Sequence, residues 1–217
     1  MVDLSGVCLR CMGCGACYDV SMDYMTCPRC GLPLIFEYDL DSVGEHFDPE
    51  MLGGRVKSVW RYRELFPPFD DRFIVSLGEG YTPVVSSTSL GEKFGLRKLS
   101  FKLEYVNPTG SLKDRGSTLL VSWVKALGVE ALADDSSGNA GASLAAYSAR
   151  GGLKCTIYVP EETPLGKVVQ AVLYGAEIRR VAGGRSATAE RIRLDAEKGL
   201  ICLLYTSDAA DDMQCVD

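Results

Sequence analysis

This sequence has a single histidine, and it lacks long apolar runs and an excess of basic charge. The 217 residues include one histidine, His46, with no second histidine and no carboxylate pair at ligand spacing near it. A Ser-His-Asp hydrolase is therefore excluded from most of the chain, and we give His46 no catalytic role. No apolar run approaches the roughly 20 residues of a membrane span, and the amino terminus lacks the charged and apolar regions of a signal peptide.

The net charge of -6 gives no general attraction to nucleic acid. An apolar content of 47% is enough for a real core. We therefore expect a globular cytoplasmic protein that takes a small-molecule substrate and binds neither nucleic acid nor membrane. The oligomeric state cannot be read from the sequence, so a homo-oligomer of the full-length protein stays open.

Cysteine, by contrast, is abundant at the amino terminus. Six of the nine cysteines fall in the first 30 residues and form Cys-x2-Cys pairs, namely Cys8, Cys11, Cys14, Cys17, Cys27 and Cys30. In a reducing compartment this spacing indicates metal binding rather than disulfides. Four thiolates suffice for tetrahedral zinc, but spacing alone cannot choose among the three overlapping pairs of the first cluster. The alternatives are six free thiols or an iron–sulfur centre, and the Gly turns of paired knuckles favour a zinc ribbon over the latter.

A single lysine loop organises the rest of the chain. Residues 107–116 read Asn-Pro-Thr-Gly-Ser-Leu-Lys-Asp-Arg-Gly, after a stretch of strand composition at 99–103 and before apolar residues at helical spacing. Thr109 or Ser111 can cap the helix, leaving unpaired N–H groups and a positive dipole end near Lys113. Such surroundings lower the pKa of a lysine, whose amine can then form a Schiff base with an aldehyde cofactor.

Strands and helices alternate after this loop. We expect strands at 131–135, 155–159 and 177–181, with helices ending at Arg150, running through 168–173 and spanning about 186–198. This order predicts an α/β fold with a parallel sheet and flanking helices. Ligands sit at the carboxyl ends of such strands. We place the Lys113 loop and the Ser-Ser-Gly-Asn-Ala-Gly loop at 136–141 at two such ends, so they should converge on one crevice.

The lysine loop resembles the lysine motif of fold-type II pyridoxal-phosphate enzymes, most closely the threonine synthases. The resemblance runs from residue 76 to about 199 and includes Ser-Leu-Gly-Glu-Gly-Tyr-Thr-Pro at 76–83 and Trp-Arg-Tyr-Arg-Glu-Leu at 60–65. It implies a zinc ribbon at 1–38, closed by a strand at 32–38, then a connector at 39–75 and a partial cofactor-binding α/β domain at 76–201. The carboxyl-terminal part of the fold would be missing.

Family resemblance also assigns the zinc ligands. Threonine synthases often open with a ribbon whose first knuckle runs into Gly and, shortly after, Tyr. Cys11-x2-Cys14-Gly15 followed by Tyr18 matches that pattern. The implied ligands are Cys11, Cys14, Cys27 and Cys30. Cys8 and Cys17 depart from the family pattern and are left over.

The same resemblance implies roles at the active site. Lys113 would hold pyridoxal 5'-phosphate, and Asn139 would bond the phenolic oxygen of its ring. The substrate carboxylate would be bound by Ser136, Ser137 and the amides of Gly138 to Ala140. Lys102 and Arg115 are candidates for the substrate phosphate, although either could instead pair with Asp114 or Glu104.

The implied reaction converts O-phospho-L-homoserine and water to L-threonine and phosphate, with Lys113 as the base. Threonine synthases more usually show Ser-Thr-Gly-Asn-Thr where this chain has Ser-Ser-Gly-Asn-Ala, so a cysteate synthase or a serine or threonine dehydratase stays open. A zinc-ribbon interaction module on a catalytically silent scaffold is the alternative from another class. Intact Lys113 and Asn139 argue against it.

Family members carry a Gly-rich cup for the cofactor phosphate, and a hydroxyl facing the pyridine nitrogen, downstream of the matching stretch. No second Gly-rich loop follows a suitable strand here. We therefore expect an amino-terminal fragment that retains cofactor poorly. Residues 202–217 resemble translated sequencing-adapter read-through, so we expect a non-native tail there, with a genuine divergent tail as the alternative.

Overall fold

A four-stranded parallel sheet lies at the centre of the carboxyl-terminal part of the chain. The computed structural model describes residues 7–20, 26–197 and 202–203. The strand order is β8-β7-β6-β9, all pairs parallel. The strands are β6 (Ala131–Asp134), β7 (Lys154–Pro160), β8 (Glu177–Val181) and β9 (Cys202–Leu203). The predicted parallel sheet is confirmed, and residues 204–217 of the predicted tail lie outside the described residues.

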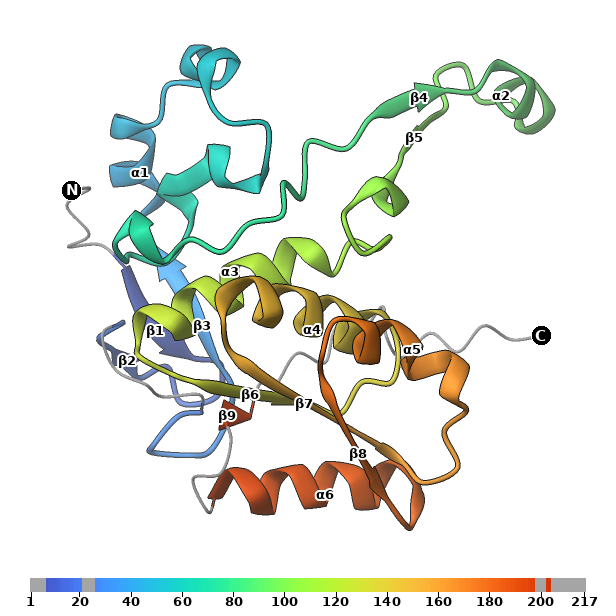
Figure 1. The fold of residues 1–217 in the computed structure, drawn as a ribbon. Coiled ribbons are helices and arrows are strands. Elements are labelled where there is room, and N and C mark those ends of the chain that lie inside the picture. Colours follow the sequence, from blue (N-terminus) through green and yellow to red (C-terminus); the bar gives the residue numbers. More distant parts are fainter. Residues whose placement is uncertain (1–6, 21–25, 198–201, 204–217) are drawn as a thin grey trace.

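Helices cover both faces of this sheet (Figure 1). One face carries α3 (Asp114–Ala126), α4 (Asn139–Gly151) and α5 (Leu165–Leu173), and the other carries α6 (Gly184–Glu197). α4 is composed mostly of small residues and is buried from Ala140 to Ser148. The small side chains let it pack closely on its neighbours. The main core lies between these three helices and the sheet and includes Val121, Val124, Leu132, Leu144, Ile157 and Val168.

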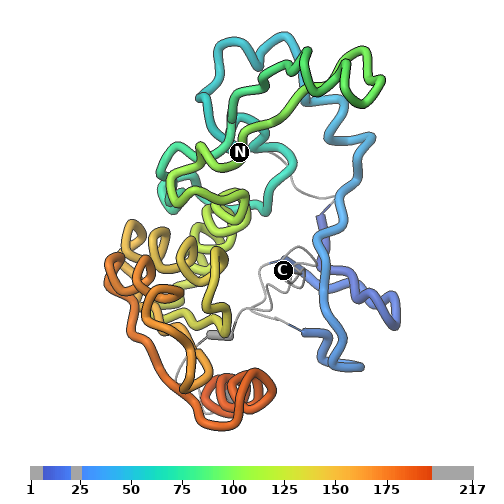
Figure 2. The backbone as a smooth tube through the Cα atoms, turned by 90° about the vertical axis from the view of Figure 1, so that its right-hand side faces the viewer, coloured from blue at the N-terminus to red at the C-terminus, as the bar shows by residue number. Residues whose placement is uncertain are grey.

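A second, antiparallel sheet is formed by the amino-terminal residues. Its order is β2-β1-β3, from β1 (Val7–Cys11), β2 (Cys17–Tyr18) and β3 (Leu34–Tyr38). Figure 2 shows it to one side of the helices that cover the central sheet. The edge of the Phe36 ring meets the Trp123 ring of α3, with ring centroids 5.2 Å apart.

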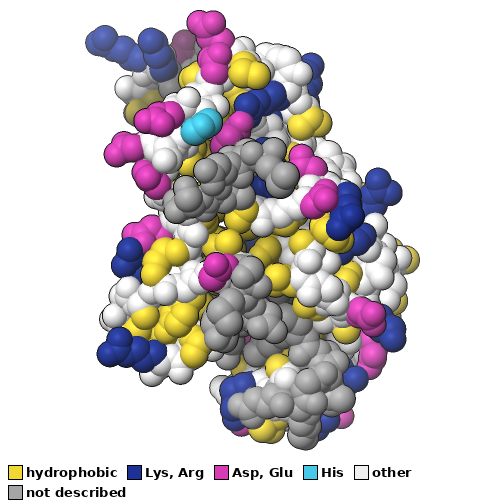
Figure 3. All heavy atoms as spheres, turned by 90° about the vertical axis from the view of Figure 1, so that its left-hand side faces the viewer, with side chains coloured by type: hydrophobic (Ala, Val, Ile, Leu, Met, Phe, Trp, Pro, Cys, Tyr) yellow, Lys and Arg dark blue, Asp and Glu magenta, His cyan; other side chains and the backbone are white. Residues whose placement is uncertain are grey.

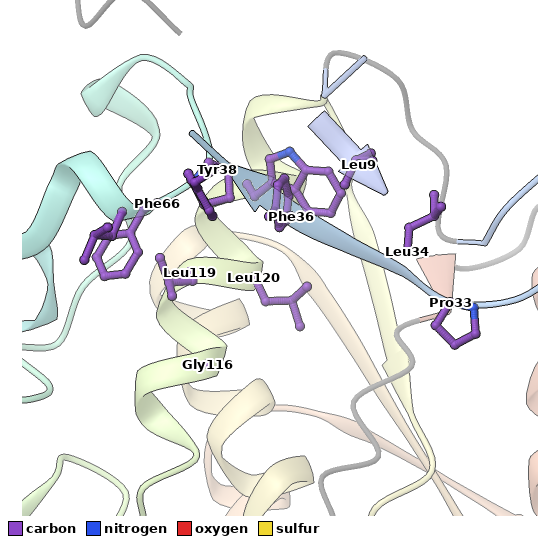
Figure 4. A pocket seen from close by; sticks show the side chains of 12 residues that line it. Leu9, Pro33, Leu34, Phe36, Tyr38, Phe66, Gly116, Leu119 and Leu120 are labelled. Carbon is purple, nitrogen blue, oxygen red and sulfur yellow. The ribbon is translucent and has the colours of Figure 1, made fainter. Parts of the chain in front are cut away.

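An apolar cavity of about 450 Å³ lies between this small sheet and α3 (Figure 4). Its walls are side chains of β1 and β3, the segment at 65–67 and the outer face of α3, including Leu9, Phe36, Phe66 and Leu120. Neither Lys113 nor Asn139 lines it. The cavity is therefore separate from the candidate active site.

The connector at 39–75 contains short helices that the sequence analysis did not predict. They are α1 (Leu40–His46) and the 3-10 helices η1 (Pro49–Gly54), η2 (Val59–Leu65) and η3 (Asp71–Phe73). Each begins at a side-chain cap, contributed by Asp39, Asp48, Ser58 and Asp70. The segment packs onto α3, because buried Trp60 donates its indole N–H to Thr118 Oγ1 at 2.9 Å.

The strand before the lysine loop does not belong to the central sheet. β5 (Ser100–Lys102) pairs antiparallel with β4 (Val84–Ser86), and the two are joined through α2 (Thr88–Phe94). All residues of both strands are exposed, so β5 lacks the buried apolar run of a central parallel strand. A further 3-10 helix, η4 (Glu104–Val106), separates β5 from the loop. Our placement of the Lys113 loop at the end of a parallel strand was wrong.

Charges of both signs are interspersed on the face shown in Figure 3, without a large field of one sign. Within the part of the chain that the structure describes, every helix is too short or too polar to cross a membrane.

Candidate active site and cysteine cluster

Lys113 lies at the end of a tight turn, directly before the first residue of α3. Gly110 adopts a φ of 83°, a left-handed conformation that favours glycine. Ser111 Oγ accepts from the Lys113 N–H at 3.2 Å and so closes the turn before the helix. The predicted helix cap by Thr109 or Ser111 was wrong, because no side chain of the residues that the structure describes caps the start of α3 and the Thr109 hydroxyl donates to Asp114 instead. The next three N–H groups also have partners, the carbonyls of Ser111, Leu112 and Lys113. Unpaired N–H groups at this helix start were therefore wrongly predicted, because the turn itself satisfies them.

Asp114 ties the lysine loop to α4. Its carboxylate is fully buried and accepts from the backbone N–H of Thr109 at 2.7 Å and from the Thr109 hydroxyl. It also accepts from the Ser143 hydroxyl at 2.6 Å, one turn beyond Asn139 on α4. The lysine loop and the loop at 136–141 are thus held beside each other through α3 and α4, although only the second follows a strand of the parallel sheet.

The loop at 136–141 presents the first turn of α4. A Cβ on Gly141 would lie 2.1 Å from the Ser136 carbonyl oxygen, so only glycine fits this approach. Ser136 Oγ accepts from the Gly138 N–H at 3.3 Å. In the described part of the chain, no group accepts from the N–H groups of Asn139, Ala140 or Gly141. A helix start of this kind binds anions. Asn139 is exposed, Ser136 and Ser137 are half-buried, and Ala140 is buried.

A buried acid that joins the segment at 76–83 to α4 was not identified from the sequence. Glu79 is fully buried and accepts from the Tyr147 hydroxyl at 2.7 Å, the Ser76 hydroxyl at 3.0 Å and the Leu77 N–H at 2.9 Å. Burial, and then this hydrogen bond, raises the pKa of Tyr147. The next residue, Gly80, donates its N–H to Asn107 Oδ1 at the start of the lysine loop. The sequence signal for this hydrogen bond was Tyr147, a large side chain in a helix made mostly of small residues, because a buried hydroxyl needs a hydrogen-bond partner.

Arg115 makes a two-pronged ion pair with Glu104. Its Nε and Nη2 lie 2.8 Å from the two carboxylate oxygens, and Nη2 also donates to Thr82 Oγ1 at 3.0 Å. The Arg115 guanidinium lowers the pKa of Glu104 to about 2. This is the pairing that the sequence analysis kept as the alternative to phosphate binding. Lys102 Nζ, the other candidate, donates to the Thr82 carbonyl at 3.1 Å.

Four cysteines converge at the tip of the small sheet. The sulfurs of Cys11, Cys14, Cys27 and Cys30 all lie within 4.8 Å of one another. The Cys11 and Cys30 sulfurs are 3.3 Å apart, and those of Cys14 and Cys27 are 3.6 Å apart. Sulfurs around tetrahedral zinc with bonds of about 2.3 Å are roughly 3.8 Å apart, so the set fits that ion.

The surroundings of this cluster favour a thiolate at Cys27. Burial alone would raise the pKa of Cys27, but hydrogen bonds from the Tyr18 hydroxyl and from backbone N–H groups outweigh it and lower the pKa to about 6. Tyr18 lies 3.2 Å from the Cys27 sulfur. The Leu32 N–H lowers the pKa of Cys30, but hydrogen bonds to the neighbouring thiols of the cluster outweigh it and raise the pKa to about 12. A metal ligand must be deprotonated, so the surroundings of Cys27, and not those of Cys30, suit one before a metal binds.

Cys8 and Cys17 lie apart from that cluster and are joined as a disulfide, with Cα atoms 5.9 Å apart. The expectation that the amino-terminal cysteines serve a metal rather than disulfides was therefore wrong for this pair. Side chains alternate across a strand, so Cys8 and Cys11 of β1 point to opposite faces. Cys8 thus cannot take the place of Cys11 in the cluster.

Known proteins resemble this chain over the same regions. Residues 75–210 match the family model described as "Pyridoxal-phosphate dependent enzyme", a range that runs past residue 201. The threonine synthase of Methanocaldococcus jannaschii is 43% identical over 196 residues, which cover 90% of this chain and 48% of that protein. The threonine synthase of Methanosarcina acetivorans is 39% identical over 81% of this chain and 42% of its own length.

Among solved structures, a pyridoxal 5'-phosphate-dependent aspartate racemase superposes with a TM-score of 0.53 at 31% identity, covering 60% of this chain and 41% of the other. The chain spans about half the length of the curated relatives it matches. The lysine before α3 and the first turn of α4 belong to helices that pack on each other and are joined by the Ser143–Asp114 hydrogen bond. The family match, which includes both loops, assigns this chain to the pyridoxal-phosphate dependent enzymes.

Proposed function

We propose that the chain is part of a threonine synthase, which converts O-phospho-L-homoserine and water to L-threonine and phosphate. The observation that carries the proposal is the match to two threonine synthases along most of this chain, including the Lys113 and Asn139 loops. Bound pyridoxal phosphate would supply an electron sink for negative charge that develops beside the substrate nitrogen. The protein must hold the ring, orient the substrate and move protons.

Lys113 is proposed to hold the cofactor through its amine and then to take the proton from Cα of the substrate. Its half-buried position at a turn fixed by Asp114 supports this role, because a proton acceptor must be positioned before it is useful. Asn139 would bond the phenolic oxygen of the ring. Asn139 is the first residue of α4, and the hydrogen bond from Ser143 to Asp114 holds α4 against the lysine loop.

The first turn of α4 is proposed to bind the substrate carboxylate. The amides of Gly138 and Ala140 and the hydroxyls of Ser136 and Ser137 offer donors of the kind that carboxylates require. Lys102 and Arg115 remain the proposed ligands of the substrate phosphate. Of the two we favour Lys102, since the charge of Arg115 is already matched by Glu104.

We propose that Cys11, Cys14, Cys27 and Cys30 bind one structural zinc ion. Their mutual distances support this role, and four protein ligands leave no open position for substrate. Residues 1–38 would then be a zinc ribbon, residues 39–75 a connector and residues 76–201 part of the cofactor domain. The non-native tail at 202–217 stays a prediction.

An assay of the full-length gene product decides the reaction. Phosphate release from O-phospho-L-homoserine is expected, and it should be lost in Lys113→Ala. Cofactor absorbance without phosphate release would indicate another amino-acid substrate, such as that of a cysteate synthase or a dehydratase. The absence of both cofactor absorbance and phosphate release would indicate the non-catalytic zinc-ribbon module.

A further inference from the structure

The two cysteines left over from the zinc cluster form a site of their own. Cys17 opposes Arg10 of β1, and Glu37 of β3 opposes Cys8. Directly opposed residues of an antiparallel pair share a face, and so do Cys8 and Arg10, which are two positions apart on β1. Cys8, Cys17 and Glu37 therefore lie on the same face of the small sheet. The ligand atoms of these three residues all lie within 4.8 Å of one another.

The zinc cluster does not share this face. Cys11 and Leu9 are buried on the other face of β1, at 2% exposure each, whereas Cys8 is half-buried and Cys17 is exposed. The backbone between β1 and β2 is a tight hairpin. In this hairpin the Cys11 N–H donates to the Ala16 carbonyl at 2.8 Å, and the Gly15 N–H donates to the Cys11 carbonyl at 3.1 Å. The leftover pair is thus reachable from solvent without disturbing the cluster.

The Cys8–Cys17 bond encloses half of the cluster. Cys8 and Cys17 are nine positions apart, and Cys11 and Cys14 lie in the ring that the bond closes. Closing a ring of this size removes conformational freedom from the chain when no metal is bound. Because zinc binding must order the same hairpin, the bond lowers the entropy that zinc binding costs.

We propose that Cys8 and Cys17 are a reversible dithiol–disulfide site that locks the first zinc knuckle. In the reduced form the hairpin is held by its backbone bonds and by the metal alone. In the oxidised form the covalent ring holds it as well, and zinc leaves less readily. The inference rests on the zinc site proposed above.

The oxidant is a low-molecular-weight disulfide. The thiolate of exposed Cys17 attacks one of its sulfurs, which forms a mixed disulfide and releases one thiol. Cys8 then attacks the Cys17 sulfur, forming the Cys8–Cys17 bond and releasing the second thiol. The cysteine pair loses two electrons and two protons, and the oxidant becomes two thiols. Excess thiol reverses both steps.

Thiol mapping tests the pairing. The purified 217-residue chain is loaded with zinc, equilibrated with mixtures of reduced and oxidised glutathione, alkylated and mapped by mass spectrometry. We expect a Cys8–Cys17 link that appears and disappears with the glutathione ratio, while buried Cys155 stays reduced as an internal reference. A link from Cys8 or Cys17 to any of the four cluster cysteines, or no Cys8–Cys17 link at any ratio, would overturn the proposal.

Zinc retention tests the lock. Wild-type chain in its oxidised and reduced forms, and the Cys8→Ser/Cys17→Ser variant, are titrated with a competing chelator. The oxidised form should hold zinc roughly tenfold to a hundredfold more tightly than the other two. Equal retention in all three would overturn the locking role. If the link forms reversibly in a chain that takes up no zinc, both the proposed zinc site and the proposed effect of the disulfide on zinc retention are refuted. The reversible Cys8–Cys17 disulfide is then supported on its own.

Discussion

The buried hydrogen bond between Tyr147 and Glu79 offers a sharp test of how the site is supported. Tyr147 lies on α4 and Glu79 in the segment at 76–83, and both are fully buried. Tyr147→Phe removes the donor 2.7 Å from the carboxylate and leaves the ring in place. The Ser76 hydroxyl and the Leu77 N–H still serve Glu79, so the loss is one hydrogen bond to a charged acceptor. Such a bond is worth about 1.5–3 kcal/mol.

Urea unfolding followed by tryptophan fluorescence measures this loss, and thermal unfolding should show a fall in Tm of about 3 to 12 °C. Tyr105→Phe is the matched control, because Tyr105 is 69% exposed and should change the free energy of unfolding by less than about 0.5 kcal/mol. If Tyr147→Phe were as stable as the Tyr105 variant, the bond would not hold the segment at 76–83 against α4, and our account of the site's support would be refuted.

Three further predictions concern charge, close packing and metal. Glu104 has a folded pKa of about 2 against an ordinary 4.5, so the stability it contributes is present above about pH 4.5 and is lost as the pH falls toward 2. The free energies of unfolding of wild type and Glu104→Gln should therefore converge over that range. A difference between them that stays constant with pH would contradict the Arg115–Glu104 pairing. Gly141→Ala should destabilise the chain by at least about 1–3 kcal/mol in urea unfolding, because its Cβ would overlap the Ser136 carbonyl. Gly166→Ala, a helical glycine with open space around it, is its control and should be neutral or stabilising. Chelating the proposed zinc should make four additional thiols reactive in a thiol assay, and an unchanged thiol count would contradict the ribbon.

Local sequence pattern predicted the central sheet well. The strands at 131–135, 155–159 and 177–181 correspond to β6, β7 and β8 within one residue at each end. They are apolar or bounded by Gly and Pro, so composition alone separates them from the helices between. The positions of Gly152 and Gly175 after α4 and α5 follow the same rule for helix ends.

Pairing partners could not be predicted in the same way. The strand at 99–103 exists, but nothing in its own residues says that it pairs with β4 rather than with the central sheet. The Cys8–Cys17 bond was missed for a related reason, since Cys-x2-Cys spacing is the same for a ligand and for a cysteine on the opposite face of a strand. The face is decided by the strand's register, which the structure supplies.

The buried partners of the active-site loops were also beyond the sequence. Asp114 stands beside the lysine in the loop, yet its contact with Ser143 joins residues 29 positions apart. The bond between Glu79 and Tyr147 spans 68 positions. Such pairs depend on how α3 and α4 pack, which periodicity does not determine.

Reductive trapping on the full-length gene product tests the central claim, that Lys113 holds the cofactor. The protein is incubated with pyridoxal phosphate, reduced with borohydride and digested, and the labelled peptide is identified by mass spectrometry. We predict one adduct per chain, on Lys113, and none in Lys113→Ala. An adduct on another lysine, such as Lys102, or no adduct in a folded protein, would contradict the account.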